Sequence, residues 1–205
     1  MWIKICGMTT AAGVSAALAA GADAIGFVFT ESSRRLTPQT AARLAQPARG
    51  RICCVAVTRH PTQSQVDEIV ATFAPDMLQS DAADFEALRL SPRLARLPVM
   101  RAGEAVPPLL PARVLFEGAA SGSGTLTDWN AAQSLARRTQ LVLAGGLSAD
   151  NVAAALAAVQ PYGVDVSSGV EARPGVKSPA EIMRFVAAVR AAPAAPLSLA
   201  TEGST

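Results

Sequence analysis

The sequence predicts an α/β protein that folds as one compact (β/α)8, or TIM, barrel. Eight short apolar runs alternate with alanine-rich helical patterns along the chain. The runs are continuously apolar, which is typical of parallel strands covered on both faces. Eight such units in 205 residues are enough for a small barrel. The same alternation is compatible with an open, doubly wound sheet, which is the alternative fold.

The expected strands and helices follow one another without a gap longer than a loop. The strands are expected at residues 2–6, 24–29, 51–57, 76–79, 97–101, 113–117, 140–145 and 163–167. Helical patterns lie near residues 10–20, 38–47, 62–73, 83–90, 128–138, 148–158 and 178–190. Residues 102–112 hold three prolines, and proline interrupts helices. We therefore expect an irregular connection in place of the fifth helix.

The domain boundaries follow from the same pattern. The barrel is expected to be the catalytic domain and to span residues 1–190. Residues 191–205 are rich in Pro, Ser and Thr and are expected to form a disordered tail.

Composition excludes several classes of function. The net charge is +2, and no run of Lys or Arg interleaves with aromatic residues, so a nucleic-acid surface is not expected. No stretch has the pattern of a membrane span or an export signal, so no membrane partner is expected. Three cysteines, two of them adjacent, make a poor disulfide framework and indicate the reducing cytoplasm. A single histidine and the lack of a C-x-x-C motif argue against a metal site. Both a monomer and a homodimer are compatible with this composition.

Polar and glycine residues gather where the expected strands end. In a barrel the carboxyl ends of the strands meet at one face, where active sites form. The loops at the opposite face, such as "GADA" and "PYG", are plain connectors. This asymmetry indicates a site for a small molecule at the carboxyl face.

The last two loops predict where a phosphate binds. "LAGGLSADNV" contains Gly145 and Gly146 at a strand end, and "DVSSGVE" contains Ser168 and Gly169 after the last strand. Glycine-rich turns expose backbone N–H groups that hold a phosphate dianion. The alternative is that these glycines only form tight turns and that Ser148 caps a helix. Two such loops, adjacent in a barrel, favour the phosphate site.

Cys6 and Glu117 are the candidates for proton transfer. Cys6 ends the first strand and is followed by Gly7, which leaves room for a ligand. Positive charge near Cys6 would lower its thiol pKa and make it a base, although a buried, inert cysteine is the commoner case. Glu117 ends the sixth strand beside Gly118, Gly122 and Gly124 and could be a general acid.

Several further residues carry open alternatives. Arg34 and Arg35 follow the second strand, and one of them could grip a carboxylate, or both could be solvated charges before a helix. Asp165 could be functional or a structural hydrogen-bonding group. His60 is read mainly as part of a polar loop, and Cys53 and Cys54 as packing residues within a strand.

These loops, in this order, resemble the phosphoribosylanthranilate isomerase family of tryptophan biosynthesis. The resemblance covers the chain from Ile3 to about Val189. The segments that carry it are "KICGMT", "GADAIGFVF…SSRRLT", "LAGGLSADNV" and "GVDVSSGVEARPGVKSPAEI". The first and the last of these are highly specific when they occur together.

The resemblance implies an Amadori rearrangement without a cofactor. N-(5′-phosphoribosyl)anthranilate becomes 1-(2-carboxyphenylamino)-1-deoxyribulose 5-phosphate, because an acid opens the furanose and a base takes the C2′ proton. By motif match Cys6 is the base and Arg34 meets the anthranilate carboxylate. Asp165 matches the family's aspartate. The phosphate loops match at Gly145, Gly146, Ser168 and Gly169.

The chain departs from the family pattern at three positions. The family's general acid is an aspartate, and here Glu117 stands in its place. Asp81 replaces a usual histidine, and Thr58 replaces a usual phenylalanine. These changes leave open a divergent isomerase of another phosphorylated amino sugar, or a barrel that binds a sugar phosphate without turnover.

Overall fold

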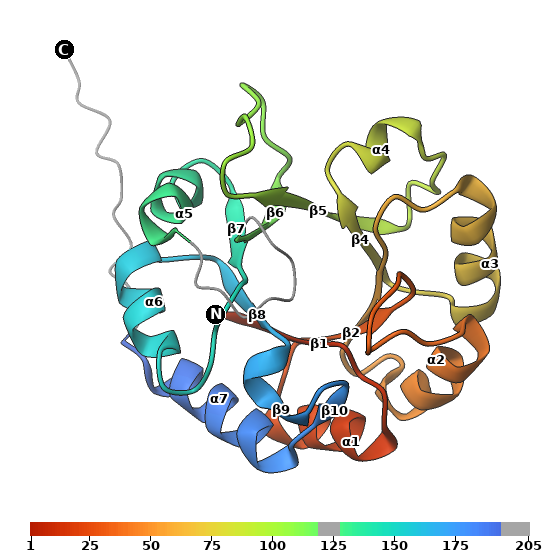
Figure 1. Cartoon of the computed structure of the whole chain (residues 1–205), viewed down its shortest axis with the longest axis horizontal. Coiled ribbons are helices and arrows are strands. Elements are labelled where there is room, and N and C mark those ends of the chain that lie inside the picture. Colours follow the sequence, from red (N-terminus) through yellow and green to blue (C-terminus); the bar gives the residue numbers. More distant parts are fainter. Residues whose placement is uncertain (119–127, 194–205) are drawn as a thin grey trace.

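The computed structural model describes residues 1–118 and 128–193 and is a closed barrel of eight parallel strands (Figure 1). The barrel strands are β1 (Trp2–Cys6), β2 (Ala24–Val28), β3 (Cys53–Val57), β4 (Met77–Asp81), β5 (Ala95–Arg101), β6 (Arg113–Glu117), β7 (Gln140–Leu143) and β8 (Gly163–Val166). They lie in sequence order, and β1 pairs with β8, with Ile3 opposite Val164. This closure confirms the predicted barrel, and the open-sheet alternative is wrong.

Helices surround the barrel in a ring (Figure 1). The α-helices of the described residues are α1 (Ala11–Ala20), α2 (Pro38–Ala45), α3 (Gln63–Phe73), α4 (Asp84–Ala87), α5 (Trp129–Ala136), α6 (Val152–Val159) and α7 (Pro179–Ala191). Two short 3-10 turns, η1 (Gln46–Ala48) and η2 (Ser168–Val170), and a small hairpin of β9 (Glu171–Arg173) and β10 (Val176–Lys177) complete the chain. None of the helices in these two ranges is long and apolar enough to cross a membrane.

The helices begin where short polar side chains accept backbone N–H groups. Thr10, Thr37, Thr62 and Ser178 cap α1, α2, α3 and α7 in this way. At Thr62 the bond is reciprocated, because the Gln65 side chain accepts the N–H of Thr62. These caps set the start of α1, α2, α3 and α7 and therefore the length of the loop before each of them.

The observed elements differ from the expected ones at a few places. No helix joins β5 to β6, as expected from Pro107, Pro108 and Pro111. The helix after β4 is shorter than expected, because the backbone is already extended at Leu88. The hairpin of β9 and β10 was not expected. Of the predicted tail, residues 194–205 lie outside the described residues.

The inside of the barrel is aliphatic toward the amino ends of the strands and charged at their carboxyl ends. One buried cluster fills the lower part and consists of Ala24, Val55, Met77, Leu97, Val99, Leu115, Val142 and Ala144. Successive side chains of a strand alternate between its faces, so the inward positions of β4, β5 and β6 end in Asp81, Arg101 and Glu117. The inward positions of β1 end in Lys4 and Cys6. The fold therefore delivers charged groups to the carboxyl face on top of an apolar plug.

Candidate active site

Cys6 lies at the carboxyl end of β1, directly above a buried ion pair. Lys4 points inward from the same strand, has no exposed surface, and donates to Asp165 Oδ1 from Nζ at 2.8 Å. Asp165 stands opposite Lys4 in the register of β1 and β8. The Cys6 thiol is itself buried, with 8% of the residue exposed. Asp165 therefore anchors Lys4.

The electrostatics around Cys6 combine burial with charges of both signs. Burial raises the pKa of Cys6, Lys4 lowers it, Asp165 raises it and Lys177 lowers it. The net direction is upward, because burial of a thiolate outweighs the attraction of the two ammonium groups. The same ammonium group of Lys4 is held in its charged form: burial lowers the pKa of Lys4, but Asp165 and Cys6 raise it by more.

Arg34 lies beside Cys6 and makes a bidentate ion pair within the protein. Its Nε and Nη2 donate to Glu171 Oε1 and Oε2 at 2.7 and 2.9 Å. Lys177 Nζ donates to the same carboxylate at 3.0 Å and to the Ser167 carbonyl at 2.8 Å. Hydrogen bonding to Glu171 raises the pKa of Arg34. One edge of the Arg34 guanidinium is thus occupied, and the end formed by Nη1 and Nη2 still carries donors.

Gly7 leaves room for this arginine. Its φ is +80°, and a Cβ there would come within 2.5 Å of Arg34 Cδ. The space that the sequence assigned to a ligand is therefore partly filled by the Arg34 side chain. Arg35, in contrast, is exposed and lines a cavity of about 580 Å³ above β2 and β3.

The two expected phosphate loops lie against each other. A Cβ on Gly169 would collide with the Leu147 carbonyl oxygen, so the loops after β7 and β8 touch through their backbones. Gly145 and Gly146 have φ of +92° and +66°. Asn151 braces the first loop by accepting from Ser148 N and donating to Gly146 O. Asn151, not Ser148, is the N-cap residue of α6, so the capping alternative for Ser148 is wrong.

Four backbone N–H groups of these loops are available to a ligand. In residues 1–118 and 128–193, the N–H groups of Gly145, Gly146, Ser168 and Gly169 have no hydrogen-bond acceptor. The residues themselves are half-buried, except for Ser168, which is exposed. Half-buried N–H groups without a partner favour an anionic ligand.

Glu117 belongs to a second charged group on the far side of the mouth. Arg101 Nη2 contacts Glu117 Oε1 at 3.1 Å and Asp81 Oδ1 at 2.6 Å. All three side chains are mostly buried. The glycines at positions 122 and 124, which accompanied the expectation for Glu117, lie outside the described residues. Two of the departures from the family pattern, Asp81 and Glu117, thus share one guanidinium.

The third departure, Thr58, is satisfied within the barrel wall. Thr58 is 6% exposed, and its hydroxyl donates to the Gln79 carbonyl at 3.2 Å. The Thr58 hydroxyl is therefore used to hydrogen-bond β3 to the neighbouring strand β4.

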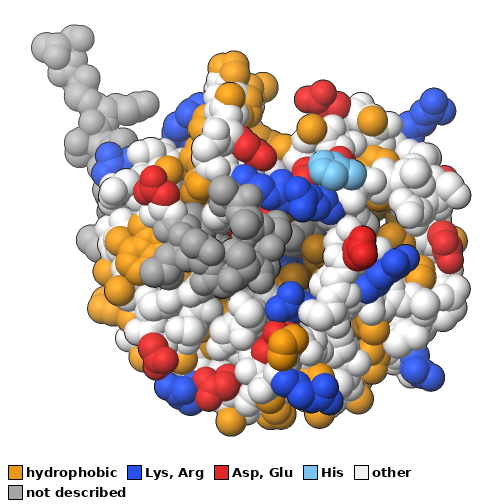
Figure 2. Space-filling view, in the orientation of Figure 1, with side chains coloured by type: hydrophobic (Ala, Val, Ile, Leu, Met, Phe, Trp, Pro, Cys, Tyr) orange, Lys and Arg blue, Asp and Glu red, His pale blue; other side chains and the backbone are white. Residues whose placement is uncertain are grey.

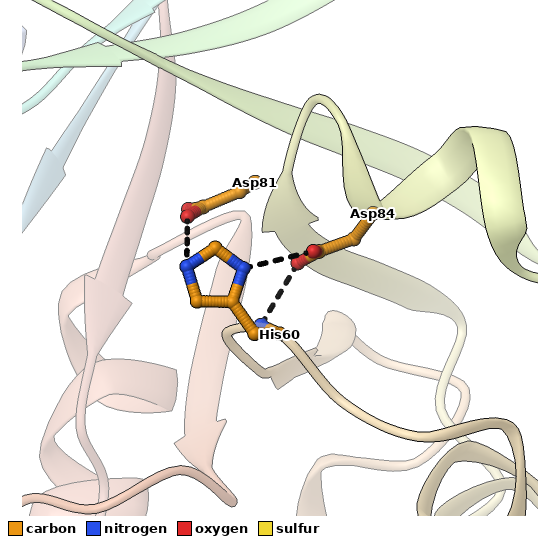
Figure 3. Close-up of side chains that lie close together, drawn as sticks. All are labelled: His60, Asp81 and Asp84. Atoms are coloured by element: carbon orange, nitrogen blue, oxygen red, sulfur yellow. Dashed lines mark hydrogen bonds and ion pairs between the residues drawn. The ribbon is translucent and has the colours of Figure 1, made fainter.

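His60 stands between two carboxylates at the edge of the mouth (Figure 3). Its Nδ1 lies 3.0 Å from Asp84 Oδ1, and its Nε2 lies 3.4 Å from Asp81 Oδ2. Burial raises the pKa of Asp84, but hydrogen bonds from Ser80 and His60 lower it by more. Basic side chains gather beside the histidine over the centre of the barrel (Figure 2).

The same three residues are the one possible group of metal ligands in the part of the chain that the structure describes. The two carboxylates face opposite nitrogens of the ring, and a histidine offers one nitrogen to a metal ion. Arg101 and Arg59 also contact Asp81, at 2.6 and 3.5 Å. The arrangement is that of an ion-pair network around an imidazole.

Several residues of the site escaped the sequence analysis. Lys4, Lys177 and Glu171 were not singled out, although Lys4 stands two positions before Cys6 in an apolar strand. That spacing puts both side chains on one face and was a usable signal. Cys53 and Cys54 are the first two residues of β3, away from its carboxyl end, and burial raises the pKa of each thiol to about 11.

Comparison with known proteins assigns the family. The profile described as "PRAI: N-(5'phosphoribosyl)anthranilate (PRA) isomerase" matches residues 3–188. The N-(5'-phosphoribosyl)anthranilate isomerase of Mesorhizobium japonicum is 39% identical over 93% of this chain and 95% of its own. That of Brucella canis is 40% identical over 96% and 97%. The phosphoribosyl anthranilate isomerase structure from Thermus thermophilus aligns with a TM-score of 0.81, at 26% identity, over 93% of this chain and 98% of that one. The chain belongs to the N-(5'-phosphoribosyl)anthranilate isomerase family.

Proposed function

We propose that the carboxyl face of this barrel carries out the family's isomerisation with Cys6 as general base and Glu117 as general acid. The isomerisation is the Amadori rearrangement of N-(5'-phosphoribosyl)anthranilate in tryptophan biosynthesis. The observation that carries the proposal is the position of the Cys6 thiol. It lies on the same rim as Arg34 and the two touching loops after β7 and β8. One substrate can therefore present its phosphate, sugar and aromatic acid to all three.

The phosphate end is bound by the backbone of the last two loops. The N–H groups of Gly145, Gly146, Ser168 and Gly169 supply donors that a dianion accepts without a cationic side chain. The contact of Gly169 with Leu147 holds the two halves of this cradle together. A phosphate there directs the ribose toward β1 and Cys6, because β8 and β1 are neighbours.

The aromatic carboxylate is bound by the free end of Arg34. Glu171 fixes the guanidinium through Nε and Nη2, so its orientation is set before the substrate arrives. The Nη1 and Nη2 end then offers a planar fork to a second carboxylate. Such preorganisation reduces the entropy lost on binding.

The proton transfers need only these two side chains. Glu117 takes up a proton from solvent beside Arg101 and gives it to the ring oxygen. The bond from that oxygen to C1′ then breaks to leave a Schiff base. Cys6 takes the C2′ proton, and the resulting enolamine tautomerises to the ketone. The atoms balance, since the substrate gains one proton and loses one, and solvent returns Cys6 and Glu117 to their starting forms. No redox or group-carrying cofactor enters this scheme, and we assign the enzyme to the reducing cytoplasm because its three cysteines are free.

Replacing Cys6 by serine tests the base. A serine hydroxyl ionises far above the thiol pKa of about 8.5, so it cannot take a carbon-bound proton near neutral pH. We expect kcat to fall by about a hundredfold or more, the usual contribution of a general base, while product affinity stays unchanged. Steady-state turnover and fluorescence titration with product measure the two quantities. Near-normal turnover in Cys6→Ser would make Cys6 a packing residue.

The pair Glu117→Gln and Asp81→Asn tests the acid. Both variants remove one carboxylate from Arg101, and Asp81→Asn also removes the contacts of Asp81 with Arg59 and His60, so it is the more disruptive of the two to the ion pairs. If Glu117 delivers the ring-opening proton, Glu117→Gln lowers kcat by about a hundredfold and Asp81→Asn lowers it much less. The reverse order would assign the acid to Asp81. Glu117→Asp, which restores the family's shorter acid, is expected to keep activity.

Inorganic phosphate tests the cradle. Phosphate or sulfate should compete with substrate in the wild type, and Gly146→Asp should abolish binding because it adds bulk and negative charge at a positive φ. Competition is followed by initial rates at several substrate concentrations. An unchanged KM in Gly146→Asp would remove the phosphate from these loops.

A further inference from the structure

We propose that Lys4 is a positioning residue whose ammonium group, anchored by Asp165, is the counter-ion of the Cys6 thiolate and sets the pH at which Cys6 can accept a proton. The effect of Lys4 on catalysis rests on the proposed role of Cys6 as the base. The ionisation of the thiol can be measured whether or not that role is correct.

The strand geometry brings the two side chains together. Lys4 and Cys6 are two residues apart on β1 and point to the same side. Gly26 lies beside Cys6 on the neighbouring strand β2. A Cβ on Gly26 would lie 3.0 Å from Cys6 Sγ and 3.2 Å from Lys4 Nζ. The thiol and the ammonium group therefore share the space that Gly26 leaves open, within the roughly 6 Å over which opposite charges shift a pKa.

Asp165 keeps the ammonium group in this place. The hydrogen bond of 2.8 Å to Asp165 uses one of the three N–H donors of Lys4. Lys4 has no exposed surface, so water does not compete for the remaining donors from the outside. A buried lysine with only an apolar neighbourhood would lose its charge, and Asp165 prevents this.

Four charged groups act on Cys6, and Lys4 is distinct among them. Lys4 stands on β1, Asp165 on β8, Lys177 on β10 and Arg34 in the loop after β2. Lys177 and Arg34 both donate to the carboxylate of Glu171, whose negative charge offsets their positive charge as felt by the thiol. Burial is the largest influence on the Cys6 pKa and raises it, and Lys4 is the largest influence that lowers it.

The sign of the expected change follows directly. The base is the thiolate, so activity rises with pH as Cys6 loses its proton. Without Lys4, burial and Asp165 raise the thiol pKa with less opposition, and the rise in activity moves to higher pH. Without the charge of Asp165, the buried Lys4 loses its charge and its effect on the thiol. The rise in activity then also moves to higher pH, because Lys4 acts on Cys6 more strongly than Asp165 does.

Three variants test the proposal: Lys4→Met, which keeps the length of the side chain, Asp165→Asn, and the double variant. The pH dependence of iodoacetamide alkylation, read by peptide mass at Cys6, gives the thiol pKa. We expect the midpoint to rise by about one pH unit or more in Lys4→Met and to rise by less in Asp165→Asn, which removes the carboxylate that keeps Lys4 charged. The midpoint of Cys54, on which neither residue acts, should not move in any of the three.

The double variant separates positioning from charge balance. Lys4→Met alone leaves Asp165 buried and unpaired and can fail to fold, whereas the double variant removes both charges. We expect its thermal unfolding to be cooperative and its Cys6 midpoint to lie above that of the wild type, because Lys4 acts on the thiol more strongly than Asp165. A double variant with the wild-type midpoint would overturn the proposal and make Lys4 a partner of Asp165 only.

Turnover adds a second readout. In Lys4→Met, or in the double variant, kcat near neutral pH should fall about tenfold for every pH unit by which the thiol midpoint rises, and it should recover at higher pH, with product affinity unchanged. A raised thiol midpoint with an unaltered kcat profile would uphold the role of Lys4 in the ionisation of Cys6 and refute Cys6 as the base. The two hypotheses therefore fail in different ways.

Discussion

The buried ion pair of Lys4 and Asp165 is the interaction on which the rest of the site depends. It joins the first strand to the last at the seam that closes the barrel, and it lies directly below Cys6. Burying two charges costs several kcal/mol of solvation for each ion, and removing one partner of such a pair typically costs about 3–5 kcal/mol. An aliphatic pair would close the seam as well. The charged pair has a further effect that an aliphatic pair would lack: it holds the Lys4 ammonium group against the buried thiol of Cys6.

Two further carboxylate–guanidinium groups arrange the mouth around this centre. On one side Glu171 binds both Arg34 and Lys177, and on the other Arg101 binds both Asp81 and Glu117. In each group one charge bridges two of the opposite sign, so the side chains have fixed positions before a substrate binds. The loops after β7 and β8, which we propose bind the phosphate, need no such device, since backbone contact between Gly169 and Leu147 holds them together. The rim therefore combines a rigid backbone cradle with preorganised side chains, a division suited to a substrate that is anionic at both ends.

Much of this could be predicted from the sequence, because a barrel converts strand ends into a common face. The continuous apolar runs predicted the strands, and the residues after them indicated Cys6, Arg34, Glu117 and the glycine loops. The closure of β1 onto β8 and the irregular connection before β6 were confirmed. Which charged side chains would form ion pairs with one another could not be predicted. That Arg34 would pair with Glu171, and Glu117 with Arg101, depends on contacts between strands and loops far apart in the chain. The upward direction of the Cys6 pKa could not be predicted for a related reason, since the depth of burial at a strand end is a tertiary property.

The central claim is that the strand-end thiol makes this barrel an isomerase of phosphoribosylanthranilate. The most direct measurement is growth without tryptophan of a bacterial strain that lacks this isomerase and carries either the wild-type gene or the Cys6→Ser variant at equal protein levels. We predict growth with the wild type and failure, or severe slowing, with Cys6→Ser. No growth with the wild-type chain, or equal growth with both, would contradict the claim.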